Sequence, residues 1–255
     1  MLQYIMENFI ALSQSSKKAL QILQMSAALP VNILITGEAY VGKRLLAQTV
    51  FSEAAVFEAE KLYELIVQNK IEIAKHKEII VLNIDTLSNK MQFLEMLQPI
   101  KVVATSAKEY SDSKNYFAVK IPLKPLSKRK EDLEMLVKKY TAEANTLYQS
   151  EVDSQDVLRD TSLNALSLKR GVYKSVFLHS MDEDDIQNAL YNFFINYLQK
   201  KNYNYKDFLK VFEIPLLKAT KQLYKSQVQI AKVLDINRIT LRKKIANYFG
   251  ENNEL

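Results

Sequence analysis

Cationic side chains gather in one short stretch near the C-terminal end of the chain. From Lys218 to Asn247 the sequence has six lysines and two arginines against a single acid, Asp235, which gives this stretch a net charge of +7. The whole chain carries +6, so all its other residues together are close to neutral. Basic side chains concentrated in this way suit the neutralisation of phosphate groups, the chemistry on which nucleic-acid binding rests.

Two short helices are predicted to position these cations. Apolar residues fall at helical spacing on both sides of a corner, at Ile230, Ala231 and Leu234 before it and at Leu241 and Ile245 after it. At the corner, Asp235 tolerates the left-handed conformation, Ile236 is an apolar plug and Asn237 suits an N-cap. This layout predicts a helix-turn-helix over residues 226–248, whose second helix lies in the DNA major groove. The alternative is a solvated basic face on a packing helix, but the coincidence of charge and corner favours DNA binding.

A second set of residues that suits phosphate chemistry lies near the N-terminus. Residues 31–36 form a β-branched run typical of a buried strand, and residues 37–43 read G-E-A-Y-V-G-K before a helical pattern over residues 45–57. Strand, G-x-x-x-x-G-K and helix is the context of a phosphate-binding loop, in which backbone N–H groups and Lys43 attract phosphate. The alternative is a strand-to-helix turn that keeps its glycines for geometry only. Arg44 stands where a hydroxyl residue usually reaches Mg²⁺, and Tyr40 where a positive φ is often needed; both argue for weak or lost nucleotide handling.

Asp85 ends a second buried run, residues 78–85. One interpretation is a Walker B carboxylate, which holds Mg²⁺ through water. The other is an N-cap for a helix over residues 91–97, and the two are equally good. Further apolar runs follow at residues 100–106 and 117–123, so alternating strand and helix signals over residues 30–125 predict a parallel α/β sheet.

Helical patterns dominate the other segments. Residues 1–28 are predicted to be helical, with Ser13 or Ser15 as a cap, and residues 126–198 form a second helical region. The acidic run from Asp182 to Asp185 is expected to cap the last helix of that region and not to bind a metal. Residues 200–205 are polar and aromatic, which suggests a hinge.

Composition excludes several classes of protein. The chain has no cysteine, which rules out disulfides and thiolate metal sites and suits a reducing cytoplasm. Its two histidines lack ligand spacing. No apolar run reaches membrane-spanning length, and no signal peptide is apparent. We therefore expect a cytoplasmic protein with no metal site and no membrane partner.

The segment IPLLKATKQLYKSQVQIAKVLDINRITLRKKIANYFG resembles the DNA-binding domain of the Fis family, which is also the C-terminal domain of NtrC-type regulators. The resemblance is most specific over residues 236–244. It implies that helices from about Lys206 to Tyr224 pair with a second copy, and hence a homodimer on double-stranded DNA. Asp235 stands where the family usually has glycine, and Val228 where a polar residue that contacts phosphate is common. The predicted DNA-binding residues are Ser226, Gln227, Asn237, Arg238, Thr240, Arg242, Lys243 and Lys244.

Four upstream segments resemble, in the right order, the AAA+ domain of NtrC-type regulators. Residues 11–51 resemble its start with the P-loop, KVVATSAKEY its sensor I strand, IPLKPLSKRKEDLEMLVKKY the segment leading into its helical lid, and NALSLKR its sensor II motif. The resemblance implies an AAA+-like α/β subdomain over residues 1–125, a helical lid over 126–199, and ATP or ADP as the nucleotide. The residues implied to contact that nucleotide are Gly37, Glu38, Val41, Gly42, Lys43, Arg44 and Asp85.

The sequence departs from this family at positions that serve catalysis. The four departures are Tyr40 at a P-loop glycine, Thr86 at the Walker B glutamate, Ser106 at the sensor I asparagine and Leu166 at the sensor II arginine. No arginine finger is visible between Lys108 and Lys120, and nothing between Lys43 and Asp85 resembles the GAFTGA loop that engages the sigma factor. Phosphoryl transfer depends on positioned charges. We therefore expect neither ATP hydrolysis nor sigma-factor remodelling, and we predict no catalytic residue.

The sequence thus predicts a DNA-binding transcriptional regulator of the α/β class. A parallel P-loop, AAA+-like sheet with a helical lid is expected to precede an all-α, Fis-like helix-turn-helix domain over residues 200–255. The P-loop domain would serve assembly or nucleotide sensing. Two alternatives stay open: a weakly active NTPase that the C-terminal module localises, and a non-enzymatic interaction protein whose AAA+ remnant assembles with an intact AAA+ partner.

Overall fold

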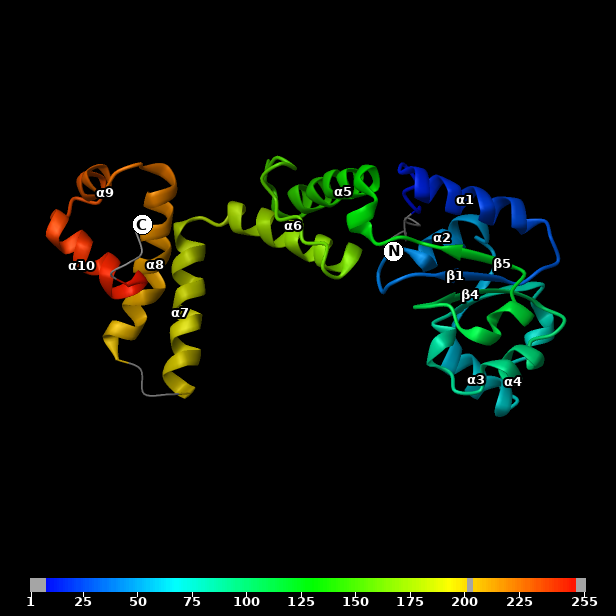
Figure 1. The fold of residues 1–255 in the computed structure, drawn as a ribbon. Helices are drawn as coiled ribbons and strands as arrows, with labels where there is room; N and C mark the ends of the chain where they lie inside the picture. Colours follow the sequence, from blue (N-terminus) through cyan, green and yellow to red (C-terminus); the bar gives the residue numbers. More distant parts are fainter. Residues whose placement is uncertain (1–7, 201–203, 251–255) are drawn as a thin grey trace. The chain divides into compact units, whose positions relative to one another are not determined.

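The computed structural model describes residues 8–200 and 204–250 (Figure 1). The chain divides between Met181 and Asp182 into two compact units, called here the first unit and the second unit. The predicted hinge at residues 200–205 includes residues 201–203, which lie outside the described residues.

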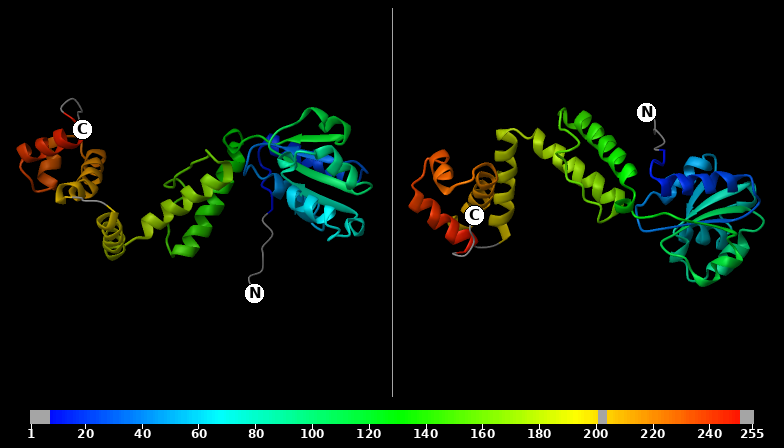
Figure 2. Two further views of the ribbon diagram at one scale, coloured as in Figure 1. Left: turned by 90° about the horizontal axis from the view of Figure 1, so that it is seen from below. Right: turned by 45° about the horizontal axis from the view of Figure 1, so that its top comes forward.

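A five-stranded parallel sheet is the centre of the first unit. Its strands are β1 (Ile33–Thr36), β2 (Ala55–Glu58), β3 (Glu78–Leu82), β4 (Lys101–Ser106) and β5 (Val119–Pro122), in the order β2-β3-β4-β1-β5. All four pairings are parallel. The helices α1 (Gln14–Ala27) and α2 (Lys43–Val50) cover one face, and α3 (Ala59–Val67) and α4 (Lys90–Met96) cover the other (Figures 1 and 2). The predicted parallel α/β class is confirmed.

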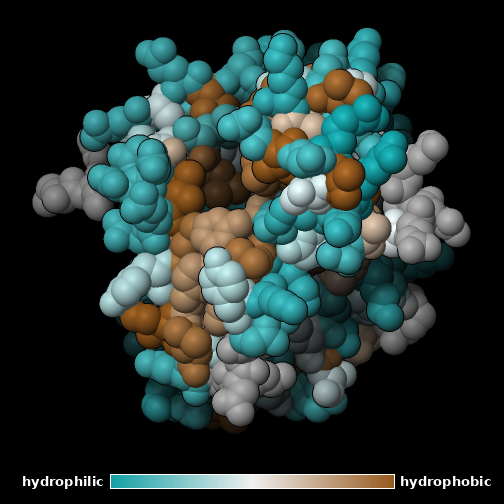
Figure 3. All heavy atoms as spheres, turned by 90° about the vertical axis from the view of Figure 1, so that its left-hand side faces the viewer, coloured by the Kyte–Doolittle hydropathy of each residue, from teal (hydrophilic) through white to brown (hydrophobic). Residues whose placement is uncertain are grey.

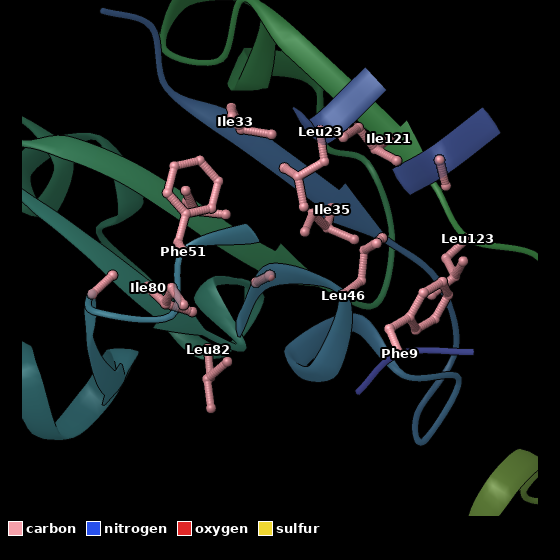
Figure 4. Close-up of a cluster of buried hydrophobic side chains, with 14 of the residues drawn as sticks. Phe9, Leu23, Ile33, Ile35, Leu46, Phe51, Ile80, Leu82, Ile121 and Leu123 are labelled. Atoms are coloured by element: carbon pink, nitrogen blue, oxygen red, sulfur yellow. The ribbon is translucent and has the colours of Figure 1, made fainter. Parts of the chain in front are cut away.

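The central strand β1 shows why the sheet is buried on both faces. Its side chains alternate, because successive residues of a strand point to opposite sides. Ile33 and Ile35 join the cluster beneath α1 and α2, whereas Leu34 joins the cluster beneath α3 and α4. Figure 4 shows the first cluster, in which Leu23 of α1 and Leu46 of α2 meet the strand residues. An uninterrupted apolar run is the pattern expected of a strand covered on both faces.

Two predicted helices differ from those observed. The helix predicted over residues 45–57 is wrong at its end, because α2 stops at Val50 and residues 55–58 form β2 at the edge of the sheet. No residue of β2 is fully buried, and its apolar residues directly follow the helical pattern of α2. Residues 8–13 are irregular, not helical, and Ser13 is the N-cap of α1, accepting a hydrogen bond from the Ser16 backbone N–H. Residues 1–7 of that prediction lie outside the described residues.

Two long helices follow the sheet in the first unit. They are α5 (Lys130–Tyr148) and α6 (Asn164–Ser180), which lie side by side (Figure 2). Their apolar side chains form a separate core. Residues 149–163 between them contain no helix, which the helical pattern over residues 126–198 did not predict.

The second unit is all helical. It contains α7 (Glu183–Lys200), α8 (Tyr205–Leu223), α9 (Gln227–Val233) and α10 (Arg238–Phe249). On α7, Phe194 packs against Phe208 and Phe212 of α8, with ring centroids 5.0 and 5.9 Å apart. The predicted boundary between residues 199 and 200 therefore lies inside this unit. The acidic run caps α7 as predicted, since the Asp185 backbone N–H donates to Asp182 Oδ1 at 2.8 Å.

Candidate functional sites

The loop between β1 and α2 has the backbone that its glycines predict. The φ angles of Gly37, Tyr40 and Gly42 are 151°, 59° and 101°. A Cβ at Gly37 would lie 2.6 Å from the Leu123 carbonyl oxygen, and at Gly42 it would lie 3.1 Å from Cε2 of Phe9. The expectation that position 40 needs a positive φ is confirmed, and a tyrosine adopts it here at a steric cost.

Lys43 turns its amine into this loop. Its Nζ donates to the carbonyl oxygens of Gly37 at 2.6 Å and Glu38 at 2.7 Å, and the residue is only 9% exposed. Burial lowers the pKa of Lys43, and the nearby carboxylates of Asp85 and Glu38 partly offset that effect. The amine therefore lies at the loop and close to Asp85, where a phosphate-binding lysine is needed.

Helix α6 begins against the same loop. Asn164, buried and with a φ of 51°, donates from Nδ2 to Glu38 Oε2 and to the Ala39 carbonyl, both at 3.0 Å. Its Oδ1 accepts from the Leu126 backbone N–H at 2.8 Å. One asparagine thus ties the loop to the beginning of the helical subdomain. The sequence marked Asn164 as the first residue of a lid motif but did not predict these contacts.

A buried ion pair holds the other side of the loop. Arg129 Nη2 donates to the Val41 carbonyl at 2.7 Å, and its Nη1 lies 3.4 Å from Asp132 Oδ2. Asp132 also accepts hydrogen bonds from the backbone of Leu12 and Ser13 and from the hydroxyl of Ser16. Sequence reasoning missed this network, because the charged run KRKED resembles a solvated surface.

The space beside the loop decides which part of a nucleotide fits. The loop backbone, the beginning of α2 and Lys43 fit phosphate. The adjoining cavity has a volume of only about 40 Å³, and its lining includes Phe9, Gly42 and Arg129. Sites for drug-sized ligands are about 300–1,000 Å³. The residues of the loop therefore fit the phosphate end, and Phe9, which belongs to the core, forms part of the wall of this small cavity (Figure 4).

Asp85 lies in a short 3₁₀ turn, Ile84–Thr86, directly after β3. Its Oδ1 accepts from the Ala107 backbone N–H at 3.1 Å, and the N-cap of α4 is Asn89. The interpretation of Asp85 as a helix N-cap is therefore wrong. Thr86 and Ser106 are the residues that align with catalytic positions in the resemblance described above. The Thr86 hydroxyl donates to the Asn83 carbonyl, and the Ser106 hydroxyl donates to the Lys108 carbonyl. Arg44 is exposed and donates to Gln48 on its own helix.

The corner between α9 and α10 has the predicted local structure. Asp235 has a φ of 50°, and Ile236 packs against the core of the second unit. Asn237 is the N-cap of α10 and accepts from the Ile239 backbone N–H at 2.8 Å. Ile230, Ala231, Leu241 and Ile245 are buried in that core. The predicted apolar faces are thus confirmed.

The predicted cations of α10 do not all point the same way. Arg238, Arg242 and Lys243 are exposed, and Arg242 Nε lies 3.5 Å from Gln227 Oε1 on α9. Lys244 instead donates to Glu213 Oε1 of α8 at 2.5 Å, and the Tyr248 hydroxyl donates to Glu213 Oε2 at 2.6 Å. Hydrogen bonds from Lys244 and then Tyr248 hold the pKa of Glu213 below its ordinary value. Ser226 is the N-cap of α9, and Thr240 is exposed on α10.

Two further searches bear on function. Within residues 8–200 and 204–250, no cluster of three or more His, Cys, Asp or Glu side chains could hold a metal ion. No helix in the described part of the chain has both the length and the apolar character needed to cross a membrane.

Comparison with known proteins finds likeness in fold and not in sequence. No protein-family model matches the chain, and no curated protein matches it. Among solved structures, NtrX from Brucella abortus in complex with ADP superposes with a TM-score of 0.54 at 14% identity, over 95% of this chain and 69% of that one. The same protein in complex with ATP gives 0.50 at 13% identity, over 94% and 69%. A third NtrX structure gives 0.52 at 13% identity, over 93% and 68%. These likenesses show that the chain shares the fold of the NtrX structures.

Proposed function

We propose that the chain is a sequence-specific DNA-binding transcriptional regulator, in which α9 and α10 form a helix-turn-helix and α10 lies in the major groove. One observation carries this proposal. On α10 the apolar residues Leu241 and Ile245 are buried, whereas Arg238, Arg242 and Lys243 are exposed. A capped corner therefore presents a basic helix face to solvent, as a recognition helix requires.

The contacts with DNA follow from this orientation. Arg242 and Lys243 are free to reach phosphates or base edges, and Gln227 orients the Arg242 guanidinium. Lys244 contributes mainly by anchoring α10 to α8 through Glu213, and only its charge acts on DNA. The proposed DNA-binding residues are Ser226, Gln227, Asn237, Arg238, Thr240, Arg242 and Lys243, with Lys244 in this secondary role.

A second copy of the chain completes the proposed DNA-binding form. None of the residues of α7 whose side chains are described is buried. Large exposed apolar surface marks an interaction site, and Figure 3 shows hydrophobic residues among polar ones on the face of the molecule that it presents. A symmetric dimer would place two copies of α10 about one DNA turn apart. The exposed apolar residues on α7 and α8 are Ile186, Tyr191, Ile195, Tyr197, Leu198, Tyr205, Phe212, Leu216 and Leu223.

The first unit is proposed to regulate DNA binding and not to hydrolyse ATP. Thr86 and Ser106 offer only hydroxyl groups that already bond to backbone carbonyls, so the charges that phosphoryl transfer needs are missing there. If ATP or ADP is its ligand, the phosphates lie along Gly37, Glu38, Val41, Gly42 and Lys43, near Asp85, with Arg44 at the rim. Binding of a nucleotide would stabilise one conformation of the loop. The hydrogen bonds of Asn164 to Glu38 and Ala39 would transmit a change in that conformation to α6.

The function is tested by removing two exposed cations. The double substitution Arg242→Ala with Lys243→Ala should weaken DNA binding more than tenfold at physiological salt. It should also lower the slope of log affinity against log salt by about two, because each phosphate contact releases about one counterion. Lys17→Ala with Lys18→Ala, which removes the same charge from the exposed side of α1, is the matched control. Equal affinities for the two variants would overturn the DNA-contact assignment.

Turnover assays separate this proposal from the NTPase alternative. ATP hydrolysis by the pure protein that disappears in Lys43→Ala would show an active enzyme. Co-purification of an intact AAA+ protein, with no retardation of any DNA, would instead favour the interaction protein.

A further inference from the structure

One side chain on the outer face of α10 is apolar among basic neighbours. Ile239 is 64% exposed, whereas Leu241 and Ile245 are buried and Tyr248 and Phe249 pack against the same core. Single exposed apolar residues are common on protein surfaces. Ile239 differs from these residues in its position on α10.

Helix geometry places Ile239 at the centre of the exposed face. At 3.6 residues per turn, Ile239 lies on the side of α10 opposite to the buried residues Leu241 and Ile245. Arg242 and Lys243, three and four residues later, are its neighbours on that side. Ile239 is also the second residue of α10, and the first residues of a recognition helix are those that contact base edges.

The cap of α10 fixes where Ile239 stands. The Ile239 backbone N–H donates to Asn237 Oδ1 at 2.8 Å, so the first turn of the helix is held in place. Its β-branched side chain has one strongly preferred rotamer in a helix. The methyl groups of Ile239 are therefore presented in a defined direction, between cations that would hold the flanking phosphates.

We propose that Ile239 contacts the C5-methyl group of a thymine in each half-site and so selects thymine there; this inference rests on the proposed DNA-binding function. Thymine alone presents a methyl group in the major groove, and apolar side chains pack against it. Cytosine has only a hydrogen at C5, so it offers no methyl group for this side chain to pack against.

The test removes one methyl group at a time. A duplex is first selected from a random-sequence pool by the full-length protein. Each thymine is then replaced singly by deoxyuridine, which lacks only the C5-methyl group, and dissociation constants are measured. At one thymine per half-site, uracil should weaken wild-type binding about fourfold, the effect of exposing one buried methyl-sized group.

Ile239→Ala makes the test specific. This variant should bind the thymine duplex more weakly than wild type and should bind the thymine and uracil duplexes equally at that position. Val233→Ala, which shortens another exposed apolar side chain on α9, should keep the fourfold sensitivity. Both variants should keep the wild-type melting temperature, because both side chains are exposed.

The outcomes separate the inference from the function it rests on. If uracil is tolerated at every thymine by the wild type, or if Ile239→Ala remains equally sensitive, the thymine contact is wrong and DNA binding still stands. If the protein selects no duplex at all, both proposals fall together.

Discussion

Asp235 holds the corner between α9 and α10 in the left-handed conformation, with a φ of 50°. It is also the only acid between Lys218 and Asn247. Most non-glycine residues lose about 1–2 kcal/mol in this conformation, and Asp loses less because its short side chain can bond locally. Asp235 therefore lowers the stability of the corner slightly through its backbone and disfavours phosphate through its charge.

Asp235→Gly should relieve both effects. We expect the free energy of unfolding of the second unit to rise by up to about 1 kcal/mol, and DNA affinity to rise several-fold at low salt and less at high salt. Asp235→Asn keeps a side chain that tolerates the left-handed conformation and removes only the charge, so it should show the affinity gain without the stability gain. Binding isotherms at two salt concentrations and thermal unfolding measure these changes. A fall in affinity for both variants would contradict the expectation that the charge of Asp235 disfavours DNA.

Local residue roles were predictable from the sequence, and distant ones were not. Tyr40, Asp235 and Asn237 were predicted correctly, because positive φ angles and N-caps depend on a few neighbouring residues. The contacts of Asn164 with Glu38 and of Arg129 with Val41 join residues 126 and 88 positions apart. No pattern in a single sequence shows that such residues meet. The sequence likewise did not show that Lys243 is exposed whereas Lys244 bonds to Glu213, because that bond depends on the position of α8 beside α10.

At the level of elements, the strands inside the sheet were predicted, and of the two edge strands β5 was predicted and β2 was not. The strands β1, β3 and β4 lie inside the sheet and have uninterrupted apolar runs, so they were predicted. The strand β2 lies at the edge and is only partly buried, and its residues continued the preceding helical pattern. Asp85 was ambiguous because a carboxylate after a strand suits either a Walker B position or the N-cap of the following helix.

Asp132 of α5 bonds to the beginning of α1 and to the residues just before it. Its buried carboxylate accepts the backbone N–H groups of Leu12 and Ser13 at 2.7 and 2.8 Å and pairs with Arg129. Asp132→Ala would leave Arg129 as an uncompensated buried charge and these donors without their acceptor. We expect the first unit to lose about 3–5 kcal/mol of stability.

Hydrogen exchange followed by mass spectrometry can localise that loss. In Asp132→Ala, amides at the beginning of α1 should exchange faster, together with those of the loop around Val41. Glu131→Ala, which removes the exposed acid next to it, should leave both segments protected. Unchanged protection in Asp132→Ala would mean that the network does not hold α1 in place.

At the scale of the whole molecule, the boundary between the two units was harder to predict from the sequence than the helices and strands were. The break between Met181 and Asp182 has no glycine or proline, and the helical pattern continues on both sides. The aromatic contacts of α7 with α8 place α7 in the second unit. Charge did not mark this boundary either, because each unit carries a net charge of +3 and only the stretch from Lys218 to Asn247 is strongly basic.

The proposed dimer is a property of the whole molecule and supplies its last prediction. Leu216 of α8 is 49% exposed within one chain. Leu216→Glu should therefore leave the helix content unchanged and place a charge in the interface between two copies, which is costly to bury unpaired. The molar mass from light scattering should fall from two chains to one. DNA affinity should fall by a factor of about 10²–10⁴, because linked half-site binding is lost.

Leu178→Glu on α6, at a side chain 54% exposed in the first unit, is the matched control. If both variants keep the mass and affinity of the wild type, the second copy does not pair through α8.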